Sequence, residues 1–238
     1  MSATPAAVVF GARNVGRAIV ADRLREGWGV VAVVNSDATA SSLLDAHSDA
    51  EVIVGDAAAE PVVDQALARA SRLGRLQLVA NAITAPPRDD SFGGGPIAEA
   101  PEDRLSSWMD GFVPMAWQIM RRSSVALREA GGGTLIQVAG GSARRGFEGR
   151  GPWGAAQHAV KALIQSLSAE MRPHEVHAAM LILDGYVETE RHPLGDDDPR
   201  TSIHPDDVAA AVAYLHSQTP RAWSHEMILT PALEPWTP

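Results

Sequence analysis

The chain has 238 residues, 45% of them hydrophobic, which suits one large α/β domain with a substantial core. Its net charge of −9 argues against a general nucleic-acid or anionic-membrane surface, and the absence of cysteine excludes disulfides, thiolate nucleophiles and thiolate metal sites. The N-terminus lacks the basic and long apolar regions of a signal peptide, and no apolar run reaches membrane-spanning length. We therefore expect a cytoplasmic protein without nucleic-acid or membrane partners.

The first 34 residues have the pattern of a βαβ unit. Residues 6–10 predict a buried strand of a parallel sheet, residues 17–26 an amphipathic helix, and residues 30–34 a second strand. The turn after the first strand bears glycines, an arrangement that places a pyrophosphate at a helix N-terminus. A tight turn without a ligand is the alternative. The predicted cofactor-binding residues of the turn are Gly11, Arg13, Asn14, Val15 and Gly16.

The end of the second strand bears on the choice of cofactor. An acidic residue there would bind the ribose 2′-hydroxyl and favour NAD. The chain has Asn35 and Ser36 instead, both predicted cofactor contacts, and Arg13 lies in the nearby turn. These residues favour a 2′-phosphate, and so NADP(H) over NAD(H). The alternative is that Arg13 is a solvated surface residue.

Two more strands are predicted at residues 52–54 and 76–80. Asp56 and Ala57 follow the third strand and are expected to contact an adenine edge, although Asp56 also suits an N-cap of the helix from Pro61. Asn81 and Ala82 end the fourth strand and are predicted cofactor contacts as well. Residues 84–101, rich in Pro and Gly, predict a loop.

The second half continues the alternation of strands and helices. A polar, Pro-containing segment at 190–204 predicts a short lid, and Pro114 is expected to kink the helix that contains it. The predicted elements are helices at 103–128, 154–168 and 208–216, and strands at 134–139, 176–183 and 226–229. No internal repeat is present. The pattern predicts a Rossmann-like, doubly wound parallel sheet in a three-layer α/β/α domain spanning residues 1–238.

The order of these landmarks resembles the short-chain dehydrogenase/reductase family over nearly the whole chain. The turn from Gly11 to Gly16 looks like a shortened T-G-x-x-x-G-x-G motif, and Asp56 matches the family's aspartate after the third strand. Residues 78–82 resemble the N-N-A-G strand end, and residues 184–189 resemble the P-G-x-V-x-T segment along the nicotinamide half of the cofactor. The resemblance implies an NAD(P)-dependent oxidoreductase. It adds Gly185, Val187 and Thr189 to the predicted cofactor-binding residues.

The family's catalytic residues are replaced in this chain. Members use a Ser, a Tyr that exchanges the substrate proton, a Lys four residues after the Tyr, and often an Asn. The matching positions hold Gly140, Trp153, Gln157 and the pair Asp110-Gly111, and no Tyr is followed four residues later by Lys. An indole N–H donates a hydrogen bond but transfers no proton near neutral pH, and a neutral amide does not shift a neighbouring pKa through charge.

Three residues are candidate substitutes. Asp184 stands in place of the family proline, near the expected nicotinamide carboxamide, although turn chemistry before Gly185 also explains it. Ser142 lies two residues after Gly140, and a shift of the loop would bring its hydroxyl to the position of the family serine. The alternative is that this hydroxyl faces solvent. Lys161 lies one helical turn after Gln157, where a surface or subunit-interface role is the alternative.

The remaining side chains give less specific indications. Trp108, Trp117 and Trp153 line either an aromatic pocket or the core. The eight histidines show no metal-ligand spacing, so no metal site is predicted.

Two functions are compatible with this sequence, and a third is less well supported. The first is an NADP(H)-leaning oxidoreductase of a small carbonyl, imine or alkene with non-standard acid–base residues. The second is a catalytically degenerate relative that serves as a regulatory or structural subunit of an active paralogue, or as a nucleotide sensor. The third is an isomerase or lyase with Asp184 or Asp110 as base. The resemblance also implies a homodimer or homotetramer through the helices at 103–128 and 154–168, or a hetero-oligomer with an active paralogue.

Overall fold

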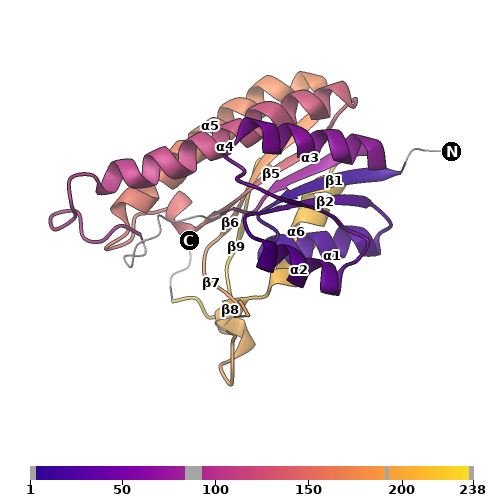
Figure 1. Ribbon diagram of the computed structural model, residues 1–238. Helices are drawn as coiled ribbons and strands as arrows, with labels where there is room; N and C mark the ends of the chain where they lie inside the picture. Colours follow the sequence, from indigo (N-terminus) through magenta and orange to yellow (C-terminus); the bar gives the residue numbers. More distant parts are fainter. Residues whose placement is uncertain (1–3, 84–92, 191–192, 236–238) are drawn as a thin grey trace.

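The computed structural model, which describes residues 4–83, 93–190 and 193–235, contains a seven-stranded parallel sheet (Figure 1). Its strands in chain order are β1 (Pro5–Phe10), β2 (Gly29–Val34), β3 (Glu51–Val54), β4 (Arg75–Asn81), β5 (Gly133–Gly140), β6 (Val176–Leu183) and β9 (Glu226–Leu229). The spatial order is β3-β2-β1-β4-β5-β6-β9. The predicted doubly wound sheet is therefore confirmed.

Helices cover both faces of the sheet. They are α1 (Val15–Arg25), α2 (Asp37–Ala46), α3 (Glu60–Leu73), α4 (Arg104–Glu129), α5 (Gly151–Met171) and α6 (Pro205–Ser217). Figure 1 shows α3, α4 and α5 on one face and α1, α2 and α6 on the other. Each helical layer buries its own apolar cluster against the sheet, and all eight residues of β6 are buried, as expected for a central parallel strand.

The direction of the strand order reverses beside β1, which pairs with β2 on one side and with β4 on the other. In open α/β sheets, ligands bind in the crevice outside the carboxyl ends of the strands at such a reversal. The turn after β1 and the end of β4 border this crevice. The fold therefore places the two predicted cofactor segments Gly11–Gly16 and Asn81–Ala82 next to each other.

Several local predictions are corrected. The sequence did not predict α2, whose N-terminus is capped by Ser36: its Oγ accepts a hydrogen bond from the Thr39 N–H at 3.3 Å. Helix α1 begins at Val15 and so includes the last glycine of the turn. Helix α4 continues through Pro114, and the kink expected at this residue stays a prediction.

The two predicted loops are only partly described. Residues 84–92 of the first loop and residues 191–192 of the second lie outside the described residues. The second segment contains a short 3-10 helix (Pro199–Thr201) and β8 (Ser202–Ile203), which pairs with β7 (Tyr186–Val187). No helix in the described parts of the chain is long and apolar enough to cross a membrane.

Candidate functional site

The turn between β1 and α1 depends on both of its glycines. Gly11 has a φ of +82°, and a Cβ there would lie 2.8 Å from Cγ1 of Ile83. A Cβ at Gly16 would collide with the carbonyl oxygen of Gly11. The side chain of the N-cap residue Asn14 does not cap α1, so within the described part of the chain the N–H groups of the first turn are available to an anion. These features fit a dinucleotide pyrophosphate at this turn.

The turn also contacts the segment that follows β6. Nδ2 of Asn14 donates a hydrogen bond to the carbonyl oxygen of Glu188 at 3.0 Å, and Arg17 forms an ion pair with Glu190 at 2.7 Å. Arg13 is exposed and lines a hollow of about 230 Å³ that also borders Asn14, Arg17 and Glu190. The predicted residues of the turn and of the 184–189 segment are therefore brought together.

The residues predicted to surround the adenosine half have local structural roles. Asn35 is exposed, whereas Ser36 caps α2. The carboxylate of Asp56 accepts a hydrogen bond from the Ala58 N–H at 2.9 Å, while α3 begins only at Glu60. The expectation that Asp56 caps this helix is wrong, because its side chain instead accepts from the backbone N–H two residues later, in the turn before the helix.

Asn81 takes part in a buried amide pair that the sequence analysis missed. Its Nδ2 donates to Oε1 of Gln137 at 2.9 Å, and its Oδ1 accepts from the Ile83 N–H at 3.1 Å. Gln137 in turn donates to the carbonyl oxygen of Val138 at 2.9 Å. The available signal was a single amide in the otherwise apolar strand 135–139. The pair joins β4 to β5 beneath the crevice.

The residue predicted to stand at the position of the family tyrosine, Trp153, lies in an aromatic cluster. Trp153 is 5% exposed, and its ring centroid lies 4.8 Å from that of Trp108 and 5.2 Å from that of Phe112. Trp117 is 49% exposed and does not belong to this cluster. Core packing therefore accounts for Trp108 and Trp153, and their indoles offer no group that titrates near neutral pH.

The position of the family lysine is also closed to solvent. Gln157 is fully buried in α5, and neither its Oε1 nor its Nε2 has a hydrogen-bond partner among the described residues. Gly140, at the position of the family serine, is the last residue of β5 and has no side chain to present. The three positions thus provide no acid, base or charge.

Asp184 forms an ion-pair cluster at the carboxyl end of β6. Its side chain is 2% exposed, with Oδ2 at 3.1 Å from Arg144 and Oδ1 at 3.4 Å from Arg145. A Cβ at Gly141 would collide with Oδ1, so this glycine makes room for the carboxylate. The guanidinium of Arg145 also lies 4.0 Å from the ring centroid of Phe147. Both carboxylate oxygens are therefore engaged by guanidinium groups within the protein.

The other two candidate substitutes, Ser142 and Lys161, lie on different elements. Ser142 is 2% exposed within a short 3-10 helix (Gly141–Ala143), so it is buried rather than solvent-facing. Lys161 forms an ion pair with Glu226 at 2.7 Å, which joins α5 to β9. Its ammonium is therefore engaged at the edge of the sheet. Across the described parts of the chain, no group of three or more His, Asp or Glu residues is arranged to hold a metal ion.

Comparison with known proteins matches this architecture to a family. The model of the short chain dehydrogenase family matches residues 5–197. No curated protein matches the sequence significantly. Similar solved structures include a short-chain dehydrogenase from Rhodopseudomonas palustris, which is 22% identical with a TM-score of 0.77, over 95% of this chain and 98% of that one.

Two further structures show the same fold at low identity. The 3-hydroxyacyl-CoA dehydrogenase type-2 from Mycobacterium avium is 20% identical with a TM-score of 0.81, covering 98% of this chain and 97% of its own. A variant of actinorhodin polyketide ketoreductase with NADPH is 19% identical with a TM-score of 0.80, covering 97% of each chain. The family match spans most of the sequence, and the sheet and turn have the corresponding form. The chain therefore belongs to the short chain dehydrogenase family.

Proposed function

We propose that the protein is an NADP(H)-dependent oxidoreductase that handles the substrate proton without a tyrosine acid. The observation that carries this proposal is the turn from Gly11 to Gly16, where two glycines are sterically required and the side chain of the N-cap residue Asn14 leaves the N-terminus of α1 uncapped. Similar folds were solved with NADPH, with 5-hydroxy-NADP and with NADP, which supports a nicotinamide nucleotide as ligand. Titration with NADPH and with NADH, followed by nicotinamide fluorescence, tests the proposal. If neither nucleotide binds, the proposal is contradicted.

The preference for NADP(H) rests on Arg13. Its side chain is exposed beside the turn, and Asn35, at the end of β2, provides no carboxylate to repel a 2′-phosphate. Arg13→Ala is expected to raise the Kd for NADPH by about tenfold or more, since a charge-assisted hydrogen bond contributes about 1.5–3 kcal/mol. The Kd for NADH should stay within about twofold.

Both constants are measured by fluorescence titration at low ionic strength. Arg221→Ala, which removes an exposed arginine from the loop between α6 and β9, serves as the matched control and should leave both constants unchanged. Equal weakening of NADPH and NADH by Arg13→Ala would show that Arg13 does not distinguish the 2′-phosphate.

A second candidate function is a nucleotide-binding member without turnover, either a sensor or a subunit of an active paralogue. The packing of Trp153 against Trp108 and the complete burial of Gln157 favour it, because no titratable group stands at these positions. NADPH binding without NADPH oxidation over a panel of small carbonyls, imines and alkenes, together with co-purification of a second family member from the native host, would support this function. Turnover by the isolated protein would contradict it.

We also propose a homo-oligomer that pairs through α4 and α5. The two helices lie side by side on one face of the molecule (Figure 1), and α4 exposes Leu105, Trp117 and Val125 by 52%, 49% and 39%. Trp117→Asp places a carboxylate in this surface and is expected to reduce the mass measured by light scattering to that of one 25.2 kDa chain. Tyr214→Asp, at a 56% exposed position on α6, is the control and should keep the wild-type mass. A wild-type monomer would contradict the proposed pairing.

A further inference from the structure

Three histidines from separate elements meet where the strands begin, at the end of the sheet opposite the crevice. His177 is the second residue of β6, His216 lies in the last turn of α6, and His225 immediately precedes β9. The ring of His177 stacks on that of Trp223 with a centroid distance of 5.0 Å and lies 5.7 Å from the ring of His225. We call His177, His216 and His225 the histidine cluster.

Two of these rings bind the loop between α6 and β9 to the body of the protein. Nε2 of His177 donates to the carbonyl oxygen of Ser224 at 2.9 Å. Nδ1 of His225 lies 3.2 Å from the carbonyl oxygen of Ala178 in β6 and 2.6 Å from Oγ of Ser168 in α5. A carbonyl oxygen only accepts hydrogen bonds, so these two ring nitrogens carry the proton in the neutral ring. Nδ1 of His177 is buried and has no hydrogen-bond partner among the described residues.

The surroundings disfavour a positive charge on the rings. Burial, followed by the charges of Arg23 and His177, lowers the pKa of His216 from 6.5 to about 4. Burial is also the main cause that lowers the pKa of His177; the charge of His225 adds to the lowering, and the carbonyl groups of Ser224 and Leu215 partly offset it. Protonation of either ring is therefore unfavourable while the ring stays buried.

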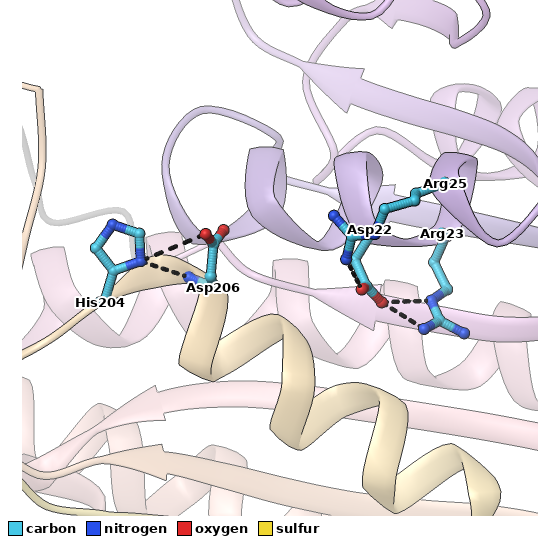
Figure 2. A network of polar contacts seen from close by, with 5 residues as sticks. All are labelled: Asp22, Arg23, Arg25, His204 and Asp206. Atoms are coloured by element: carbon cyan, nitrogen blue, oxygen red, sulfur yellow. Dashed lines mark hydrogen bonds and ion pairs between the residues drawn. The ribbon is translucent and has the colours of Figure 1, made fainter.

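Nearby carboxylates are engaged elsewhere. Figure 2 shows the carboxylate of Asp22 in contact with the guanidinium groups of Arg23 and Arg25, while Glu226 pairs with Lys161. Among the described residues, no carboxylate forms an ion pair with a ring of the histidine cluster. His204 differs, because its Nδ1 lies 3.6 Å from the carboxylate of Asp206 (Figure 2).

We propose that the histidine cluster is an acid-sensitive latch that holds the C-terminal corner of the fold, defined as residues 212–229, against the sheet. Neutral rings bind the corner to β6, α5 and Thr134 of β5, whose Oγ1 lies 3.0 Å from Nδ1 of His216. When His177 and His216 are protonated, their positive charges lie close to each other and to Arg23, and the corner separates from the sheet before the other strands do.

The sign of the pH dependence follows from the lowered pKa values. A histidine with a lowered pKa in the folded state contributes its full stabilisation above its unfolded pKa of 6.5, and this contribution is lost as the pH falls towards about 4. For His216 alone, a pKa of about 4 in the closed state against 6.5 in the open state corresponds to a fall of about 10²–10³-fold in the equilibrium constant for closing the corner. The latch is therefore closed at neutral pH and opens in acid.

The corner extends to the crevice. Strand β9 pairs with β6 from Met180 to Leu183, and the Asp184 N–H donates to the carbonyl oxygen of Leu229 at 2.9 Å. An open latch thus removes the strand that supports Asp184. The inference does not depend on the proposed function, because none of the contacts that carry it involves the predicted cofactor site.

Hydrogen exchange of the full-length protein, followed by mass spectrometry at about pH 7 and about pH 5, tests the latch once the rates are corrected for intrinsic exchange. Peptides from residues 212–229 are expected to lose protection by about tenfold or more relative to peptides from β1 and β4. Equal loss in all strands, or earlier loss elsewhere in the sheet, would overturn the proposal.

Variants identify the groups responsible. In the triple variant His177→Gln/His216→Asn/His225→Asn, amide nitrogens replace the bonded ring nitrogens but do not titrate, so the acid-dependent loss of protection should disappear. His174→Gln, which changes an exposed histidine at the same end of the sheet, should behave as wild type. If the triple variant does not fold, His216→Asn alone should reduce the acid-dependent loss in residues 212–229. An unchanged acid response in whichever of these two variants folds would contradict the inference.

Discussion

Replacement of Trp153 by tyrosine and Gln157 by lysine is expected to raise the rate of NADPH-dependent carbonyl reduction by about 10²–10⁴-fold, the contribution of a well-placed general acid. The positions predicted to match the family's acid and its charged neighbour hold an indole and a neutral amide. They are four positions apart on α5, so the new side chains would lie on the same helical face. A phenol beside an ammonium provides the proton that the present residues do not.

The same substitutions have a structural cost that the experiment must separate from the gain in rate. Position 153 loses part of its contact with Trp108 and Phe112. A lysine at position 157 would place a charge in a fully buried site, where the side-chain amide of Gln157 has no hydrogen-bond partner among the described residues. The double variant should therefore be less stable than wild type in the absence of nucleotide. Tm measured with and without NADPH distinguishes a folded, active variant from an unfolded one.

The matched control is Trp153→Phe/Gln157→Lys, which keeps the aromatic ring and the ammonium but lacks the phenolic O–H. NADPH oxidation, followed by absorbance over a panel of small ketones and aldehydes, should increase in the tyrosine variant and not in the phenylalanine variant. Equal rates in both, with NADPH binding intact, would show that a missing proton donor is not what limits turnover.

The fold could be predicted because its strands are short apolar runs separated by amphipathic helices. Helix α2 was missed because only Ala40 and Leu43 of its ten residues are buried, which leaves almost no periodic signal. Its clearest local sign was Ser36, which was predicted as a cofactor contact and which also caps the helix. A polar residue after a parallel strand suits both roles, so the sequence alone does not separate them.

The candidate site could be predicted where it is local and not where it depends on distant partners. The glycine turn is contained within residues 11–16, and the requirement for Gly16 arises within the turn, from the carbonyl oxygen of Gly11. The requirement for Gly11 already involves Ile83, which follows β4. The contacts of Asp184 with Arg144 and Arg145 join residues 40 and 39 positions apart, and the pair of Asn81 and Gln137 spans 56. Such pairings arise from strand order, which a single sequence specifies only once the topology is known.

Trp108→Ala is expected to lower the free energy of unfolding by about 3–5 kcal/mol, as for other large-to-small substitutions of core tryptophans. Trp108 is 1% exposed on α4, and its ring contacts that of Trp153 on α5, so truncation leaves a cavity between two long helices. Urea unfolding followed by circular dichroism, with the m-value compared between variants, measures the change. Tyr214→Ala, at a 56% exposed position on α6, should change the free energy by less than about 0.5 kcal/mol.

Trp108→Phe shows which part of the indole stabilises the fold. Nε1 of Trp108 is buried and has no hydrogen-bond partner among the described residues, so the phenylalanine variant removes an unsatisfied donor together with part of the ring. It should therefore lose much less stability than the alanine variant, because loss of the unpaired N–H offsets part of the lost packing. A loss below about 1 kcal/mol for Trp108→Ala would instead indicate that the aromatic side chains line a loosely filled space. Position 153 would then border a ligand pocket, and turnover without a tyrosine would be the stronger of the two proposed functions.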